Sequence, residues 1–302
     1  MDNFLKMLDT QMVLMVYMAV GFICAKKDII DQHAKQKITD LILNVALPCM
    51  IFASFNEPLT AEVIHDAEMV LIVAACITFL SYFGGRVLYS RFPDAKKRIL
   101  RYSTLVNNSG FIGMAMVDSI YGAEGLFYAS IFIIPNRIAM WTAGISIFTT
   151  ASLKDGLKKV LLNPCIIAVA LGLVREFTGF PLPDFIDSAI AGIGDTTSPL
   201  SMFIIGTMLV GISLGSMIEP SILYLSFIRL IALPIIALVV LNLIGLPPML
   251  AGISMILTGM PAGSTTVLLA VKYGADPDFA SRCVVTTTII SLVTVPLLMF
   301  LI

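Results

Sequence analysis

Two arginines lie inside long apolar segments of the sequence, where a positive charge needs a partner. Arg137 follows Asn136 near the middle of the apolar stretch 125–153, and Arg229 lies in the stretch 221–271. A helix rises about 1.5 Å per residue, so Arg137 would sit near the midplane of a bilayer. A central arginine costs at least about 2.5–3.5 kcal/mol on insertion scales. Either guanidinium could therefore provide the fixed charge that binds a carboxylate, with the Asn136 amide beside it.

Each arginine also has a structural alternative. Arg137 could form an internal ion pair with Asp118 or Asp195. The long side chain of Arg229 could reach the membrane surface, because a flexible stem can carry a charged end toward water. The sequence alone leaves these alternatives open.

Helix-breaking and hydroxyl residues interrupt the second of these stretches. The sequence Leu-Thr-Gly-Met-Pro-Ala-Gly-Ser-Thr-Thr-Val over 257–267 contains the candidate ligands Pro261, Gly263, Ser264 and Thr265. A comparable group, Asn-Asn-Ser-Gly-Phe-Ile-Gly over 107–113, contributes Asn107, Asn108 and Gly110. An unsatisfied backbone group in hydrocarbon costs several kcal/mol, so such a break persists only where it lines a cavity or is buried in protein.

Two facing breaks would present helix ends and free N–H groups at one point. The N-terminal end of a helix attracts an anion by roughly 0.3–2 kcal/mol. We therefore expect the two breaks to form a binding site for a small organic anion. The alternative is that their small residues only allow close helix packing, as small residues do in membranes.

The composition indicates the class of protein that holds these residues. Of 302 residues, 58% are hydrophobic and 13% are charged, and the mean hydropathy is +0.96. A soluble protein of this length cannot hide so much apolar surface, so we expect an all-α protein embedded in the lipid bilayer. The net charge of −1 argues against nucleic acid as a partner. The five cysteines form no Cys-x-x-Cys pair, and we expect no metal site and no cofactor.

Uncharged apolar runs predict ten transmembrane helices. Eight of the runs are 10–25, 41–56, 69–85, 102–117, 125–153, 160–174, 188–218 and 283–302. The turn at residues 245–248 divides the long stretch 221–271 into two more. Lys and Arg residues concentrate after the first, third, fifth and ninth runs. By the positive-inside rule this side is cytoplasmic, so both termini would lie outside the plasma (inner) membrane.

The two halves of the chain resemble each other. Asn44-x-x-x-Pro48 matches Asp195-x-x-x-Pro199 at an offset of 151, and the Tyr-Gly-Ala sequences at 121–123 and 273–275 match at 152. Five helices is an odd number, so the second copy would enter the membrane upside down. Residues 1–152 and 153–302 are therefore predicted to be inverted five-helix repeats, which are typical of secondary transporters.

Three further residues are candidates for binding. Asn44 offers an amide and is grouped with the substrate ligands, whereas Asp195 and Thr287 could bind a coupled Na⁺ or H⁺. Asp195 is the carboxylate most deeply placed in apolar sequence, and Thr287 stands between two other threonines. The alternatives are a helix cap for Asp195 and a hydrogen bond to the preceding helical turn for Thr287.

These motifs resemble those of the auxin efflux carrier (AEC) family, which includes plant PIN carriers and bacterial malate and malonate permeases. The similar sequences are Asn-Ser-Gly-Phe-Ile-Gly over 108–113, Met-Pro-Ala-Gly-Ser-Thr-Thr-Val-Leu-Leu-Ala over 260–270 and Tyr-Gly-Ala-Asp-Pro-Asp-Phe-Ala-Ser over 273–281. One departure is Gly-Met-Ala-Met over 113–116, where many relatives carry Gly-x-Pro-Leu. The resemblance implies a fold like that of sodium/proton antiporters and bile-acid transporters, with crossing broken helices four and nine.

The resemblance also implies a scaffold unit of helices 1, 2, 6 and 7, a transport unit of helices 3–5 and 8–10, and a homodimer. The expected function is secondary active transport of small organic anions, mono- or dicarboxylates, by elevator-type alternating access. The alternative is a membrane-embedded ligand sensor with a carrier-like site. A Gly-x-Gly-Asp sequence ends at Asp195, but the Tyr-Asp partner that an intramembrane aspartyl protease needs is missing, so we do not expect an enzyme.

Overall fold

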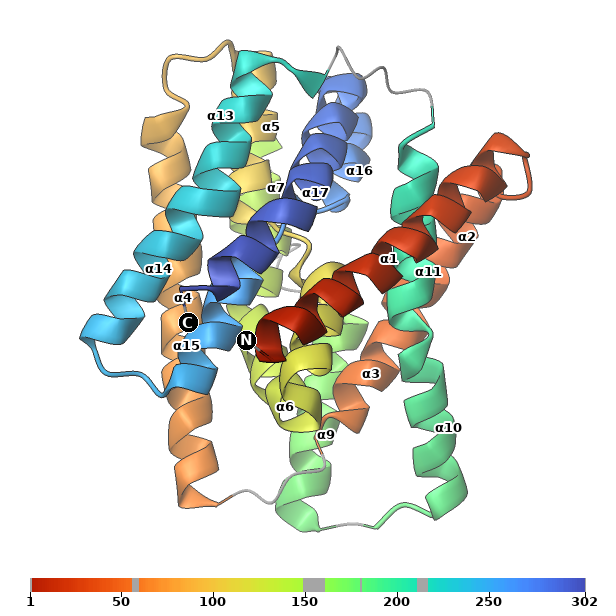
Figure 1. Cartoon of the computed structure of the whole chain (residues 1–302), viewed down its shortest axis with the longest axis vertical. Coiled ribbons are helices and arrows are strands. Elements are labelled where there is room, and N and C mark those ends of the chain that lie inside the picture. The colour runs from red at the N-terminus through yellow and green to blue at the C-terminus, as the bar shows by residue number, and fades with distance from the viewer. Residues whose placement is uncertain (1, 56–59, 149–160, 180, 211–216, 302) are drawn as a thin grey trace. The chain divides into compact units, whose positions relative to one another are not determined.

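The computed structural model describes residues 2–55, 60–148, 161–179, 181–210 and 217–301. All regular elements in these residues are helices (Figure 1). The chain divides into two compact units, each assembled from segments that are far apart in the sequence. The first unit lies within Met1–Glu68, Gly110–Ile131 and Leu161–Gly211, and the second within Met69–Ser109, Phe132–Val160 and Ile212–Ile302.

The first unit contains mostly short helices. They are α1 (Asp2–Lys26), α2 (Gln32–Leu41), the π-helical turn η1 (Ile42–Ala46), α3 (Leu47–Ala53), α9 (Pro164–Thr178), α10 (Asp184–Asp195) and α11 (Thr197–Met208).

The second unit contains the second sequence break and residues 107–109 of the first. Its elements are α5 (Asp94–Leu105), α7 (Ala143–Phe148), α13 (Pro220–Phe227), the π-helical turn η3 (Ile228–Ala232), α14 (Leu233–Leu243), α15 (Pro248–Thr258), α16 (Thr265–Lys272) and α17 (Pro277–Met299). Three elements have residues in both units, namely α4 (Ala61–Leu88), η2 (Ser109–Gly113) and α6 (Met114–Trp141).

Five helical stretches of the described residues are long and apolar enough to cross a membrane. They are Gln32–Ala53, Ala61–Leu88, Ser109–Phe148, Pro220–Leu243 and Pro277–Leu298. Shorter apolar helices cover Met12–Lys26, Pro164–Arg175 and Pro248–Thr258. The chain is therefore an α-helical membrane protein, and the full count of ten crossings stays a prediction.

Two glycines at matching places in the two halves have a positive φ angle. Gly122 and Gly274, in the two Tyr-Gly-Ala sequences, have φ angles of 63° and 66°. A positive φ is strained for a residue with a Cβ atom, which explains glycine at both places. Gly122 interrupts the long stretch that contains α6, and Gly274 lies in the turn between α16 and α17.

Close contact between α1 and α11 holds the first unit together. A Cβ atom on Gly206 of α11 would overlap the carbonyl oxygen of Met18, and one on Gly21 of α1 would overlap that of Phe203. Small residues let helix backbones approach this closely, and packing of this kind drives helix association in membranes. The α3 helix packs against α9 and α10 in the same unit.

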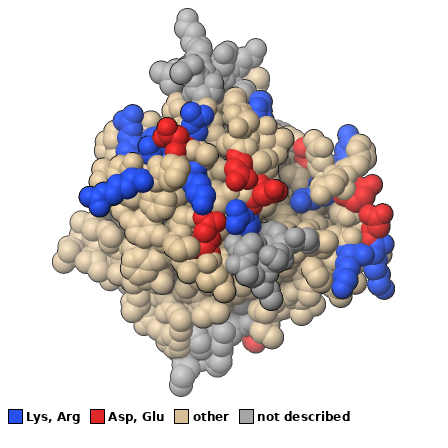
Figure 2. Space-filling view, turned by 90° about the horizontal axis from the view of Figure 1, so that it is seen from above, with Lys and Arg blue, Asp and Glu red and all other residues tan. Residues whose placement is uncertain are grey.

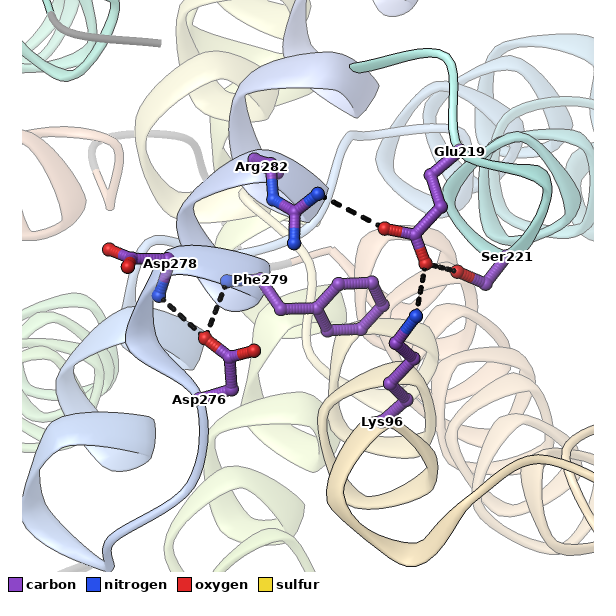
Figure 3. A network of polar contacts seen from close by, with 7 residues as sticks. All are labelled: Lys96, Glu219, Ser221, Asp276, Asp278, Phe279 and Arg282. Carbon is purple, nitrogen blue, oxygen red and sulfur yellow. Dashed lines mark hydrogen bonds and ion pairs between the residues drawn. The ribbon is translucent and has the colours of Figure 1, made fainter. Parts of the chain in front are cut away.

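An ionic cluster joins three helices of the second unit (Figure 3). Glu219, just before α13, accepts hydrogen bonds from Lys96 of α5 at 2.5 Å and from Arg282 of α17 at 3.1 Å. The Ser221 hydroxyl donates to the same carboxylate at 2.6 Å. The ring of Phe279 lies beside both cations, with the Lys96 nitrogen 5.2 Å and the Arg282 guanidinium carbon 5.5 Å from its centroid. Both distances allow cation–π attraction.

The tight contact at Gly206 yields a prediction. Replacing glycine by alanine should destabilise the fold at Gly206 and stabilise it at Gly192. Gly206→Ala should lower the free energy of unfolding by about 1–3 kcal/mol, because the backbones of α1 and α11 must move apart. Gly192→Ala in α10 should raise it by about 0.5–1 kcal/mol, because nothing lies within 4 Å of the added methyl group. Melting temperatures of the purified protein in detergent measure both effects. Equal shifts in the same direction would contradict the packing role of Gly206.

The ionic cluster yields a pH-dependent prediction. Burial alone would raise the pKa of Glu219, but the bonds from Lys96 and Ser221 and the charges of Lys96 and Arg282 outweigh it, so this pKa lies below its ordinary value. A carboxylate with a lowered pKa stabilises the fold above the pKa of the unfolded chain, and the contribution disappears as the pH falls through the folded-state pKa. Glu219→Gln should therefore lower stability by about 1–2 kcal/mol at neutral pH, and by less in acid.

The matched control for Glu219→Gln is Asp94→Asn. Asp94 pairs with Lys97 on α5, but its side chain is 84% exposed, so water screens this pair. The melting temperature should change little in the control. A Glu219→Gln protein that melts like the wild type at neutral pH would show that the cluster does not stabilise the second unit.

Candidate functional site

The chain leaves helical geometry at both motifs that the sequence singles out. The α5 helix ends at Leu105, and Val106 is extended, with φ −108° and ψ 116°. The α15 helix ends at Thr258, and α16 begins only at Thr265. Gly259, Pro261 and Gly263 explain the second break, because proline cannot continue the hydrogen-bond ladder and glycine favours helix ends.

The two broken segments pair with each other inside the second unit. Asn107 and Ala262 form an isolated antiparallel bridge. The N–H of Asn108 donates to the carbonyl of Pro261 at 2.8 Å, and the N–H of Gly263 donates to the carbonyl of Val106 at 3.1 Å. We call this paired region, residues 106–108 and 259–264, the crossing.

Three side chains satisfy the carbonyl ends of the interrupted helices. The Asn107 amide donates to Leu257 of α15, and the Asn136 amide donates to Leu105 of α5 at 2.9 Å. Arg229 donates twice, from Nη1 to the carbonyl of Thr104 at 2.8 Å and from Nε to that of Met260 at 3.1 Å. The four carbonyl groups that accept these hydrogen bonds are those of Thr104, Leu105, Leu257 and Met260. These bonds replace the helical partners that the breaks remove.

Arg229 is consequently part of the structural support of the crossing. Its side chain is only 2% exposed and reaches one carbonyl from each broken segment. It projects from η3, where the wider π-helical turn is a feature often found near functional sites. Helix C-terminal ends carry partial negative charge, so a cation is favoured there. The Arg229 guanidinium is thus already bound by backbone carbonyls of the protein itself.

Thr287 supports the second break from α17. Its hydroxyl accepts the N–H of Ala262 at 3.1 Å and lies 2.8 Å from the carbonyl of Cys283. The hydroxyl is therefore engaged by backbone groups. The neighbouring hydroxyl of Thr286 is buried and has no hydrogen-bond partner in the described part of the chain.

The N-terminal end of α16 is not satisfied in the same way. Ser264 forms no side-chain cap, and no acceptor among the described residues takes the N–H of Ser264 or Thr265. The Thr265 hydroxyl accepts a bond from Tyr102 at 3.2 Å and lies 3.9 Å from the sulfur of Met140. This end therefore keeps free donors and a partial positive charge.

Arg137 lies beside this open helix end. Its Nη1 is 3.8 Å from the same Met140 sulfur that contacts Thr265. The side chain is 8% exposed, its Nε has no hydrogen-bond partner, and no ion pair between described residues includes it. The amide nitrogen of Asn108 is likewise buried without a partner in the described chain. A buried guanidinium whose hydrogen bond within the described chain goes to a thioether is poised to bind an anion.

The structure brings some predicted ligands together and separates others. In the second unit it groups Arg137 with Thr265, and it places Asn107, Asn108, Pro261 and Gly263 in the crossing. Gly110, Asn44 and Asp195 belong to the first unit. The Asn44 amide donates to the carbonyl of Asp40 at 2.8 Å. Asp195 lines a hollow of about 380 Å³, together with the carboxylates of Asp9 and Asp118.

Sequence reasoning missed two contacts of the site. Met140 lies three residues after Arg137, so both occupy one face of a helix, and this spacing could have indicated the contact. Tyr102 lies in a different helix from its partner Thr265, 163 residues away in the chain, and no sequence pattern signals that pairing.

Comparison with known proteins agrees with a membrane carrier. The chain is 26% identical over 298 residues to an uncharacterized transporter from Methanothermobacter thermautotrophicus, covering 96% of each chain. It is 26% identical over 241 residues to the uncharacterized transporter YfdV from Escherichia coli K12, covering 75% of this chain and 76% of YfdV. A Rhizobium meliloti protein named as a candidate malonate transporter is 21% identical over 294 residues, which cover 94% of this chain and 92% of that protein.

The family described as membrane transport protein matches the chain over residues 8–155 and 148–299. These two matches together cover almost the whole sequence. The chain therefore belongs to the membrane transport protein family, that of the auxin efflux carriers.

Proposed function

We propose that this membrane transporter carries small organic anions and binds the substrate carboxylate between Arg137 and the N-terminal end of α16. One observation carries the proposal: Arg137 is a buried cation with no anionic partner among the described residues, and it shares a sulfur contact with Thr265. Burying an uncompensated charge is costly. A substrate carboxylate would remove that cost and accept charge-assisted hydrogen bonds from the guanidinium.

The polarity of the crossing also favours an anion. The carbonyl ends of α5 and α15 are occupied by Asn107, Asn136 and Arg229. The amide end of α16 and the Asn108 side chain keep free donors in the described structure. A small molecule that enters this region therefore meets donors and positive charge, which suits an anion and repels a cation.

The charges at the crossing favour a substrate with one ionised carboxylate over a substrate with two. Arg229 is occupied by backbone carbonyls, so among the described residues at the crossing Arg137 is the cation with a charge to offer. A second carboxylate would enter a place of low dielectric without compensation. We therefore propose a monocarboxylate, or a dicarboxylate with one protonated group. Hydrogen malonate fits this description, and malonate is the solute named for the Rhizobium meliloti relative.

The transport cycle belongs to the same proposal. We propose ten transmembrane helices in two inverted repeats, with both termini outside and two copies forming a homodimer. The second unit holds the crossing and Arg137, so elevator-type movement of this unit would carry the charge and the site together. Asp195 in the first unit stays the candidate for a coupled H⁺ or Na⁺. We assign Thr287 to support of the crossing, because its hydroxyl is engaged by the backbone.

Replacing Arg137 should separate binding from stability. Arg137→Gln should weaken binding of monomethyl malonate by about 100-fold or more, because removing a buried charge partner costs roughly 3–5 kcal/mol. The same change should leave the melting temperature unchanged or raise it, because an uncompensated buried charge is removed. Arg137→Lys should restore binding only in part, since an ammonium lacks the planar fork of a guanidinium. Calorimetry and thermal melting on the purified protein measure the two effects.

The comparison of malonate with its monomethyl ester tests the charge of the substrate in the same experiment. The wild type should bind the ester, a monoanion, at least as tightly as malonate at pH 7.5. Unchanged affinity in Arg137→Gln would remove Arg137 from the site. Failure of the wild type to bind any small carboxylate would overturn the proposed function.

Replacing Arg229 should have the opposite pattern. Arg229→Gln is too short to keep both carbonyl bonds, so it should leave Thr104 or Met260 unsatisfied in a buried place. We expect the melting temperature to fall by several degrees, in contrast to Arg137→Gln. The same thermal melts, run beside the Arg137 variants, make the comparison. An Arg229→Gln protein as stable as the wild type would show that Arg229 does not hold the crossing.

A further inference from the structure

Two arginines of neighbouring helices lie together where α4 ends. Arg86 belongs to the last turn of α4, and Arg101 belongs to α5. The Cα and Cγ atoms of Arg101 lie 3.7 Å from the place where a Cβ atom on Gly85 would stand. Arg101 therefore packs against the backbone of the residue that precedes Arg86. The guanidinium carbon of Arg86 is 5.8 Å from the centroid of the Tyr82 ring, one turn earlier on α4.

Neither arginine has an acidic partner within the described residues. Two described carboxylates of the second unit, on or in contact with α5, are engaged by other cations: Glu219 pairs with Lys96 and Arg282, and Asp94 pairs with Lys97. The Nε of Arg101 is buried and makes no hydrogen bond in the described structure. Burial and then the positive charge of Arg86 lower the pKa of Arg101 below its ordinary value. Two arginines on packed helices, one of them with a buried donor that no described group accepts, are suited to bind an anion.

The surface that leads to this pair is apolar and aromatic. Phe79, Leu80, Phe83 and Val87 of α4 are 62%, 60%, 42% and 75% exposed. The rings of Phe79 and Phe83 lie 4.3 Å apart between centroids. The span that contains them has a mean hydropathy of 2.0, and only 17% of it is buried inside the protein. Such a face belongs against lipid tails, and Tyr82 has the type and place of an interfacial anchor.

We propose that Arg86 and Arg101, with Tyr82 beside them, bind the phosphate of an anionic phospholipid whose tails lie along the exposed face of α4. Arginine suits this ligand because its planar fork can meet two phosphate oxygens at once. The lipid source fits better than free phosphate, because the apolar face continues directly from the two cations. Figure 2 shows that Lys and Arg side chains lie among Asp and Glu side chains on the face seen from above.

The site is independent of the anion site at the crossing, yet the two share α5. Arg101 precedes Tyr102, whose hydroxyl donates to Thr265. A bound headgroup would neutralise the arginine pair. It would also hold α4 against α5, close to the turn of α5 that contains Tyr102. Loss of lipid binding would therefore lower stability without removing any carboxylate ligand.

The test measures lipid binding by the purified protein in detergent. Native mass spectrometry and thermal melting are run with dioleoylphosphatidylglycerol, with dioleoylphosphatidylcholine and with inorganic phosphate. The wild type should retain the anionic lipid preferentially, and this lipid should raise the melting temperature more than the other two additives. The double variant R86Q/R101Q should bind the anionic lipid at least tenfold more weakly and lose the extra thermal protection.

Arg91→Gln is the matched control, since Arg91 is an exposed arginine in the turn between α4 and α5 and also has no ion pair in the described chain. It should keep the lipid preference. Equal loss in this control would mean general attraction to a basic surface and would overturn the site, as would undiminished binding in R86Q/R101Q. Equal protection by inorganic phosphate would overturn the lipid assignment. If the double glutamine variant does not fold, R86K/R101K should fold and still bind the anionic lipid several-fold more weakly than the wild type, and undiminished binding would reject the paired arginine fork.

Discussion

A backbone that stops being helical inside a membrane must have its polar groups satisfied by protein, and the second unit is organised around this requirement. The two broken segments meet part of it by bonding to each other, through Asn108 to Pro261 and Gly263 to Val106. Other carbonyls at the breaks accept hydrogen bonds from side chains of other helices, including Arg229 and Asn136. Thr287 meets the N–H of Ala262. The crossing is therefore a structure of several helices, and none of its parts could stay unwound alone.

The same requirement explains why the proposed site would favour an anion. Helix interruption creates carbonyl ends and amide ends in equal measure. Within the described structure the protein fills the carbonyl ends with its own donors and leaves the amide end of α16 open. Arg137 adds a full positive charge near the amide end of α16, whereas Arg229 donates its hydrogen bonds to carbonyls at the broken segments. Two arginines that look equivalent in the sequence thus have different tasks, one in support and one in the proposed recognition of substrate.

The sequence predicted the places of both breaks, because the cause is local: Gly259, Pro261 and Gly263 disfavour a helix wherever they occur. It also predicted the membrane class and the family, since composition and motif can be read directly from the residues. The partner of Arg229 could not be predicted, because the Thr104 carbonyl lies 125 residues away and backbone carbonyls have no sequence signature. The assignment of Asn44 as a substrate ligand and of Asp195 as a ligand for a coupled ion stays a prediction, and both residues lie in the first unit. The count of ten membrane crossings also stays a prediction, because several described apolar helices are shorter than a membrane span.

Met140 has a consequence for turnover. A carrier has to empty its site as readily as it fills it, and a thioether is a weak acceptor that holds a guanidinium only loosely. A glutamine or glutamate at this position would offer Arg137 a permanent intramolecular ligand, and an arriving carboxylate would have to compete with it. A purely aliphatic side chain would offer the cation no hydrogen-bond acceptor. The sulfur lies between these extremes, so that at the proposed site the protein could tolerate an unbound Arg137 while substrate binding would still be favoured. The lack of a strong internal acceptor for Arg137 would therefore matter as much for substrate release and rebinding as the donors that the protein provides.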